Sequence, residues 1–164
     1  MPDFETSSLG RIFYEPEWAI EFPSGLPGFE DRRRFAAITL DESAPLVFLQ
    51  SLEDPALCFI TLPVLAVDPL YRLEVSGEDL GHLGLPPAKQ PRIGTDVLCL
   101  TVVSIRESGP TANLLAPVVV HLGSHQAVQA VATDSGYSHQ HPLFPPEASF
   151  PPEALFHPEA PACS

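Results

Sequence analysis

Basic residues are scarce in this chain. Only 8 Lys and Arg stand against 21 Asp and Glu, the formal charge is −13, and no Lys or Arg follows Arg106. Proteins bind nucleic acids largely through Lys and Arg that displace counterions from the phosphates. This composition therefore predicts no direct nucleic-acid binding and favours basic protein partners. Charge that serves solubility alone is the alternative that composition leaves open.

Long apolar runs and paired cysteines are also missing. No segment approaches the ~20 apolar residues of a membrane span, and the N-terminal region is acidic where a signal peptide would be basic and then apolar. The three cysteines, Cys58, Cys99 and Cys163, form no C-x-x-C pair, and an odd number fits a reducing compartment. We expect a cytoplasmic, monomeric protein without a membrane segment, in which Cys58 and Cys99 are buried thiols.

What the sequence does contain is a series of short apolar runs between Pro, Gly and acidic breaks. The runs cover residues 10–15, 18–22, 35–40, 46–51, 57–62, 71–75, 96–105, 114–122 and 126–132. Many short strands with frequent turns predict an all-β sandwich or barrel. Residues 46–49, 97–105 and 114–122 are almost continuously apolar, as expected when both faces of a strand are covered. Residues 71–75 alternate, which predicts a strand with one face in water.

The sequence predicts a single short helix and a distinct C-terminal tail. The helix begins at Ser76, because Asp79 follows it in a capping-box arrangement, and it ends at Gly84. From residue 142 onward prolines are dense and the unit Phe-Pro-Pro-Glu recurs, which is incompatible with a sheet. We expect one domain over 1–144 and a Pro-rich, extended or disordered tail over 145–164. The repeat is a candidate docking motif, with drift in a free terminus as the alternative.

Motifs that would indicate catalysis are missing as well. The adjacent acidic pairs at 30–31, 41–42, 53–54 and 78–79 lie beside turn or cap signals, and neighbours in an extended chain point to opposite sides. We interpret them as solvated turns. There is no G-x-S-x-G, and the loop from Gly25 to Gly28 lacks the lysine of a phosphate-binding loop. The sequence predicts no enzyme and no cofactor.

The histidines offer the one alternative with metal chemistry. His139 and His141 have the spacing that places two side chains on one face of a strand, as in the metal sites of cupin barrels. The expected carboxylate is missing at the family's spacing, because Glu147 lies six residues after His141 and prolines intervene. We predict no metal site. A metal-dependent β-barrel enzyme that uses His121, His125, His139 and His141 remains the alternative.

Six blocks of sequence, in order, resemble the flagellar assembly factor FliW family. They are EFPSGLPGFEDRRRF (21–35), LQSLEDPALCFI (49–60), SGEDLGHLGL (76–85), DVLCLTVVSI (96–105), TANLLAPVVV (111–120) and YSHQHPL (137–143). The resemblance covers about residues 9–144, and the order and spacing of the blocks make it specific. It implies a small antiparallel β-barrel-like domain without enzymatic activity.

The resemblance also implies partners and a mechanism. FliW proteins bind flagellin and the translational repressor CsrA, a basic RNA-binding dimer that silences the flagellin message. Flagellin sequesters FliW, and when secretion depletes flagellin, the freed FliW binds CsrA away from its RNA-binding surface and relieves repression. The negative charge of this chain agrees with a basic partner. A generic acidic chaperone for another secreted protein is a further alternative.

Eight residues within these blocks are candidates for partner contacts: Phe29, Glu30, Glu53, Asp54, Thr111, Asn113, Pro117 and His141. Pro117 cannot donate to a ladder, so we expect its strand to be bulged or at a sheet edge, where a partner can dock. Thr111 and Asn113 would add polar contacts there, whereas Leu114 and Leu115 fit the core better. Phe29 either anchors a partner or folds back over the mouth of the barrel.

The chain departs from the family pattern at three positions. His121 stands where members commonly have Asn, Leu62 where they have Asp before a proline, and Gln140 where they have a basic residue. The fold does not depend on these residue types. Partner contacts made at those positions in the family are therefore not carried over to this chain.

Overall fold

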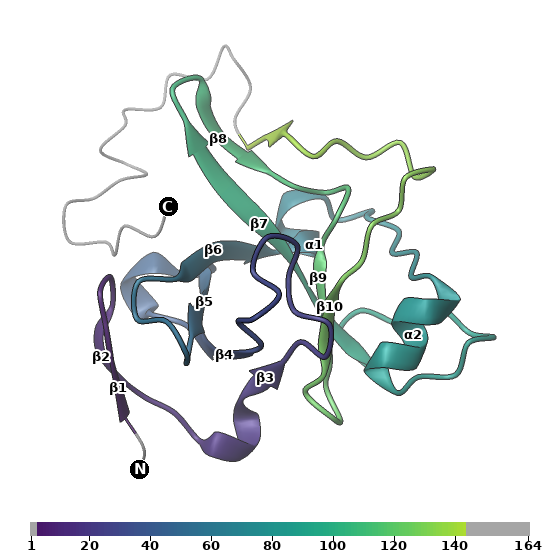
Figure 1. Ribbon diagram of the computed structural model, residues 1–164. Coiled ribbons are helices and arrows are strands. Elements are labelled where there is room, and N and C mark those ends of the chain that lie inside the picture. Colours follow the sequence, from purple (N-terminus) through teal and green to yellow (C-terminus); the bar gives the residue numbers. More distant parts are fainter. Residues whose placement is uncertain (1–2, 144–164) are drawn as a thin grey trace.

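The computed structural model describes residues 3–143, and strands dominate it (Figure 1). The strands are β1 (Asp3–Thr6), β2 (Gly10–Phe13), β3 (Ile20–Glu21), β4 (Arg34–Ile38), β5 (Val47–Ser51), β6 (Cys58–Pro63), β7 (Val97–Arg106), β8 (Gly109–Ala112), β9 (Val118–His121), β10 (Ala127–Gln129) and β11 (His141–Pro142). The helices are α1 (Val64–Val67) and α2 (Gly77–Leu83), with 3-10 turns η1 (Pro16–Trp18) and η2 (Asp41–Ser43). The predicted tail over 145–164 lies outside the described residues.

One antiparallel sheet organises the domain. Its strands follow the order β10-β9-β7-β6-β5-β4-β3, and β1 and β2 form a separate hairpin. The long strand β7 serves two partners on the same side, because its first half pairs with β9 and its second half with β8. The short strand β11 adds to β8. All of these ladders are antiparallel, which confirms the predicted all-β class.

The sheet curls until its two end strands touch. Glu21 of β3 forms a single parallel bridge with Gln126, and its backbone N–H donates to the carbonyl of His125 at 3.0 Å. No further rung joins β3 to β10 within residues 3–143. The domain is therefore barrel-like, with one hydrogen bond at the seam in place of a continuous ladder.

Both faces of β5, β9 and the first half of β7 are largely buried, as the continuous apolar runs predicted, whereas β7 is exposed from Ser104 onward. On β7 and β9, Cys99 and Val119 pack with the helix α2, whereas Leu100 and Val118 pack with Phe35 in the interior of the curl. Successive side chains of a strand point to opposite faces, so each strand supplies two core clusters. All five residues of β5 are buried for the same reason.

The predicted helix is present with the expected ends. The Ser76 hydroxyl accepts a hydrogen bond from the backbone N–H of Asp79 at 3.1 Å, and Gly84 terminates the helix with a left-handed φ of 76°. Leu80 and Leu83 are almost fully buried against β7 and β9. The helix therefore covers one face of the sheet. The four-residue helix α1 was not predicted.

Two of the predicted strands are wrong in part. Residues 71–75 keep the predicted alternation of burial but form no ladder, and the side-chain amide of Gln90 instead bonds both the N–H and the carbonyl of Val75, at 2.8 and 3.0 Å. In the run 114–122 only β9 is a strand, because residues before it form a turn. The alternating pattern of residues 71–75 therefore predicted the burial of these side chains correctly. It could not show that the Gln90 side chain, and no neighbouring strand, bonds the backbone of Val75.

The cysteine prediction is confirmed for Cys58 and Cys99, which are buried free thiols. Burial raises the pKa of the Cys99 thiol to about 12, so the unreactive thiol form dominates at neutral pH. No helix in the described part of the chain is long and apolar enough to cross a membrane.

Candidate partner-binding site

The turn that carries Phe29 and Glu30 is built by a glycine. Gly25 has φ of +71°, and a side chain there would meet the backbone of Glu30, with a Cβ only 2.5 Å from its Cα. The turn closes through a hydrogen bond from the N–H of Phe29 to the carbonyl of Leu26 at 2.7 Å. This close approach presents Glu30 to solvent at the tip of the turn.

Phe29 folds back onto the domain and remains partly accessible. Its ring meets the ring of Phe59 edge to face, with centroids 5.5 Å apart, and Phe59 in turn contacts the buried Phe35. The residue is still 38% exposed. An edge-to-face contact between aromatic rings contributes about 1 kcal/mol of stabilisation beyond that of the buried area. Phe29 therefore presents one fixed apolar face to solvent.

Glu53 has a structural task that the sequence did not indicate. One carboxylate oxygen accepts hydrogen bonds from the backbone N–H groups of Arg33 and Arg34, at 2.5 and 3.0 Å, where β4 begins. These donors, Arg34 first and Arg33 second, hold the pKa of the Glu53 carboxyl below its usual value. One oxygen of Glu53 is thus occupied by the fold itself.

Asp54 and the arginines form a local network. The Asp54 carboxylate lies 3.6 Å from Nε of Arg32, which also pairs with Asp31 at 2.7 Å. The guanidinium of Arg33 donates to the backbone carbonyl of Glu30 at 3.2 Å. Arg32 is therefore paired with two neighbouring acids. Arg33 uses a backbone oxygen instead.

A buried glutamine that sequence reasoning missed holds the turn of Glu53 and Asp54 in place. The Gln50 amide nitrogen lies 3.0 to 3.3 Å from four backbone carbonyl oxygens, those of Ser51, Asp54, Pro55 and Leu57. Gln50 is fully buried. A polar residue inside the apolar run 46–51 was the available signal, because a buried amide must find partners.

The expectation that Pro117 marks an exposed edge is wrong. Pro117 is buried and lies one residue before β9, which sits between β10 and β7 inside the sheet. Its carbonyl accepts a hydrogen bond from Ala130 at 2.9 Å, and its missing N–H is harmless because the ladder has not begun. Pro117 offers no surface for a partner.

Asn113 shapes the turn that leads to Pro117. Its side-chain oxygen accepts from the N–H of Ala116 at 3.0 Å, and its carbonyl accepts from the hydroxyl of Thr101 at 2.8 Å. Leu114 is buried, as predicted. Thr111 lies half-buried on β8, where it pairs with Ser104 and Pro142. Asn113 is therefore a turn residue with limited access.

The structure does not bring the four histidines together. His141 lies half-buried on β11, His139 precedes that strand in an exposed turn, and His121 contacts the Ser124 hydroxyl at 2.9 Å. The ring of His125 stacks on Trp18 with centroids 5.3 Å apart. No three His, Cys, Asp or Glu side chains gather into a possible metal site between residues 3 and 143.

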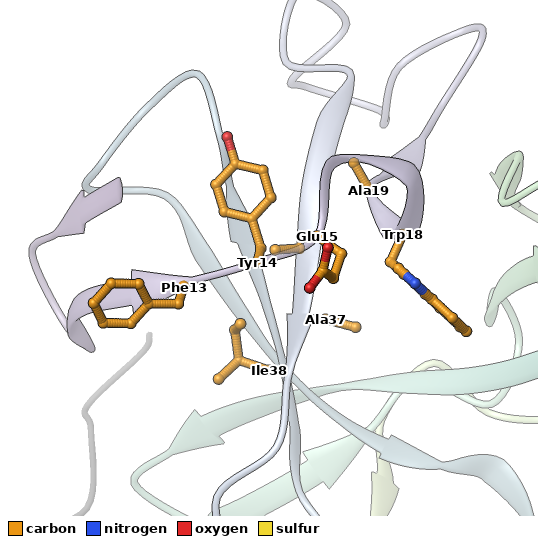
Figure 2. Close-up of a pocket in the computed structure, with 8 residues that line it drawn as sticks. Phe13, Tyr14, Glu15, Trp18, Ala19, Ala37 and Ile38 are labelled. Carbon is orange, nitrogen blue, oxygen red and sulfur yellow. The ribbon is translucent and has the colours of Figure 1, made fainter. Parts of the chain in front are cut away.

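The N-terminal part of the chain holds an aromatic surface that sequence reasoning did not identify. Phe13 is 58% exposed and Trp18 is 66% exposed, and both line a groove beside β4 (Figure 2). The available signal was the chain's single tryptophan, which directly follows two glutamates and a proline in the letters YEPEW. Single exposed apolar residues are common, and here two of them line the same groove.

Comparison with known proteins identifies the family. The family model described as "FliW protein" matches residues 3–143, which is the whole of the described domain. The chain belongs to the FliW family. The match spans the sheet, both helices and the turns that carry the candidate residues.

Individual FliW proteins are similar over nearly their whole length. The flagellar assembly factor FliW of Syntrophomonas wolfei is 35% identical over 138 residues, 84% of this chain and 86% of that protein. FliW of Bacillus subtilis is 31% identical over 140 residues, 84% of this chain and 94% of that protein. A crystal structure of the flagellar assembly factor FliW matches with a TM-score of 0.77 and 26% identity, covering 90% of this chain and 100% of that one.

Proposed function

We propose that this FliW-family chain is a non-enzymatic regulatory protein that binds flagellin and antagonises the translational repressor CsrA in the cytoplasm. Flagellin would hold the protein while it accumulates. After flagellin is exported, the freed protein would bind CsrA and relieve repression of flagellin synthesis. Family membership over residues 3–143, together with relatives that are flagellar assembly factors, is the observation that carries this proposal.

The surface charge supports a basic partner. Four carboxylates pair with arginines in the described residues: Asp3, Glu5, Asp31 and Asp54. Exposed acids such as Glu30 and Glu107 have no ion pair within residues 3–143. Unpaired charge of one sign steers an oppositely charged protein and accelerates its association.

A three-way competition tests the proposal. Purified protein, flagellin and CsrA are mixed with a labelled leader RNA of the flagellin message, and RNA release is followed. We expect the protein to release RNA from CsrA and flagellin to restore RNA binding. If the protein binds neither of them, the proposal is wrong. Tight binding of a different secreted protein in the same assay would favour a generic acidic chaperone.

A second experiment asks whether the turn of Phe29 and Glu30 meets CsrA. Phe29→Ala and Glu30→Lys are compared with Glu107→Lys, which makes the same charge change in the turn between β7 and β8. Glu53 and Asp54 are left intact, because the fold uses both. We expect Glu30→Lys to slow association most at low salt, since exposed charges are screened at high salt. Equal rates for Glu30→Lys and Glu107→Lys would show that Glu30 only contributes to overall charge.

A further inference from the structure

A groove lies between the N-terminal segment and the outer edge of β4. It has a volume of about 260 Å³ and is lined by Phe13, Tyr14, Glu15, Trp18, Ala19 and residues 36–38 of β4. Figure 2 shows Phe13 and Trp18 on opposite sides of Ala37 and Ile38, with the Glu15 carboxylate between them. Sites for small molecules are commonly about 300–1,000 Å³, so this groove fits one or two side chains better than a separate ligand.

The backbone of β4 shows which of its groups point into the groove. The carbonyl of Arg34 accepts from the N–H of Leu52, on the side of β5, at 2.9 Å. The carbonyl of Arg33 accepts from the N–H of Phe22, on the side of β3, at 2.8 Å. Alternate residues of an antiparallel strand direct their N–H and C=O groups to the same neighbour. The odd-numbered residues of β4 therefore direct their N–H and C=O groups toward β3.

β3 is too short to pair with every odd-numbered residue of β4. β3 pairs with β4 only at Ile20–Phe35 and Glu21–Arg34, because the chain before it turns away into η1. The next odd-numbered residue is Ala37, which is exposed. Its N–H and C=O point past the end of β3, where no strand is paired within residues 3–143. The groove is an open sheet edge, the kind of edge to which an extended peptide adds as a strand.

The Trp18 wall of the groove is held by a neighbouring histidine. The Trp18 ring stacks on the ring of His125 with an interplanar angle of 24°. Nδ1 of His125 lies 2.7 Å from the carbonyl oxygen of Glu17, so the imidazole is anchored beside the wall it supports. Trp18 therefore presents a preorganised apolar face at an open edge, which lowers the entropy cost of binding.

The rim of the groove is acidic. Glu15 lines the groove, and Glu17 lies in η1 between Glu15 and the lining residue Trp18. Both glutamates are exposed, and neither has an ion pair among the described residues. This charge disfavours a second copy of a chain whose net charge is −13. It equally disfavours the Pro-rich segment 144–164, which carries three glutamates, no Lys or Arg, and prolines that cannot donate to a strand edge. A basic partner fits the rim.

We propose that this groove binds an extended, basic segment of a partner protein. The segment pairs its backbone with Ala37, places an apolar side chain between Phe13 and Trp18, and directs Lys or Arg to Glu15 and Glu17. Neither Phe29 nor Glu30 lines this groove. The inference goes beyond the flagellin and CsrA proposal, because it concerns the peptide chemistry that the groove accepts and can be tested without either protein.

Trp18 provides a direct readout, because it is the only tryptophan of the chain. The probe is the capped peptide KVKLKVK, titrated into the full-length protein at low ionic strength while tryptophan emission is recorded. We expect a saturable blue shift as the peptide removes water from the Trp18 ring. The acidic peptide EVELEVE should cause no shift, because its charges match those of the rim.

Two kinds of variant test the contacts. Glu15→Lys combined with Glu17→Lys should weaken KVKLKVK binding about tenfold or more, whereas Glu107→Lys combined with Asp134→Lys, with the same total charge change, should weaken it much less. Two versions of the peptide, N-methylated on complementary sets of alternate residues, test strand pairing. One of the two should lose binding, because it lacks the donors that face β4.

Any one of three results would overturn the inference: no emission shift with KVKLKVK, equal weakening of binding by the two double-charge variants, or full binding by both methylated peptides. Two further measurements address the other occupants. If Phe144→Ala, Phe150→Ala and Phe156→Ala together shift the emission of the unbound protein, the chain's own C-terminal segment occupies the groove. If sedimentation shows a dimer that Trp18→Ala dissociates, a second copy does.

Discussion

The Glu53 carboxylate accepts a hydrogen bond from the backbone N–H of Arg34 at 3.0 Å. The two residues are 19 positions apart, and the bond ties the turn after β5 to the first residue of β4. The sequence pattern marked Glu53 as a candidate for partner contacts. Its geometry also gives it a structural role, because it bonds the backbone of Arg33 and Arg34, directly after the turn that carries Phe29 and Glu30. Glu53 therefore stabilises the start of β4, whether or not it also contacts a partner.

Replacing Glu53 should make the free energy of unfolding less dependent on pH in the acidic range. We expect Glu53→Gln to lower the free energy of unfolding at pH 7 by about 1 kcal/mol, the low end for a charge-assisted hydrogen bond at an exposed site. The folded-state pKa of Glu53 lies below its reference of 4.5. Its contribution is therefore present above that reference and is lost as pH falls through the folded value.

The measurement is urea unfolding of both proteins between neutral and acidic pH. The two curves should converge at low pH, where the wild-type carboxyl is protonated and resembles the amide. Glu42→Gln, in the turn η2, is the matched control and should leave stability unchanged. A Glu53→Gln deficit that stays constant across this pH range would contradict the assigned hydrogen bonds.

The two glycines of the LPGFE turn should differ sharply. Both have positive φ, +71° at Gly25 and +86° at Gly28, but only at Gly25 would a Cβ collide with backbone, that of Glu30. We expect Gly28→Ala to cost about 1 kcal/mol, the strain of a left-handed residue. Gly25→Ala should cost about 3 kcal/mol or more, because the backbone itself must move. Thermal unfolding of the two variants measures the difference, and equal losses would contradict the close approach.

Replacing the side-chain amide of Gln50 should lower the stability of the fold. Gln50→Glu preserves size but places carboxyl oxygens against the carbonyls that now accept from the amide, so we expect a loss of about 3 kcal/mol or more. Gln50→Met, which removes the donors without adding charge, should lose less. Urea unfolding compares both with Gln140→Glu, an exposed control. If Gln50→Glu matched Gln140→Glu, the assigned network would be wrong.

The helix α2 should depend on its cap. Ser76→Ala removes the acceptor of the Asp79 N–H and should cost about 1 kcal/mol, whereas Ser76→Gly should cost only about 0.3 kcal/mol. Ser24→Ala, at an exposed turn position, serves as the control. Guanidinium unfolding resolves these differences. Equal stability of Ser76→Ala and wild type would show that the cap does not stabilise the helix.

Local signals were reliable wherever neighbours in the chain decide the structure. The Ser76 cap with its Gly84 stop and the doubly buried strand β5 followed from spacing and composition. The interpretation of the acidic pairs as turns is confirmed for 30–31, whereas 41–42 lie in η2 and 78–79 in the first turn of α2. Pro117 shows the opposite case. A proline beside an apolar run is compatible with an edge strand and with the residue before an interior strand, and only the order of strands distinguishes the two.

The candidate site was predictable in position but not in role. The sequence placed Phe29, Glu30, Glu53 and Asp54 in two turns, and the structure confirms that both pairs lie in turns. It could not show that Glu53 bonds a strand 19 residues away, nor that Gln50 holds the second turn. Hydrogen bonds between segments far apart in sequence leave no periodic signal, because each partner is chosen by the fold.

The sequence by itself determined the acidic charge, the all-β class, the capped helix and the resemblance to FliW, because composition, periodicity and local motifs are carried by adjacent residues. The tertiary structure alone decided which acids the fold uses, that Pro117 is buried, and that β3 stops short of Ala37 between Phe13 and Trp18. An open edge is defined by the absence of a neighbouring strand. That property belongs to the arrangement of the described strands, and no single stretch of sequence contains it.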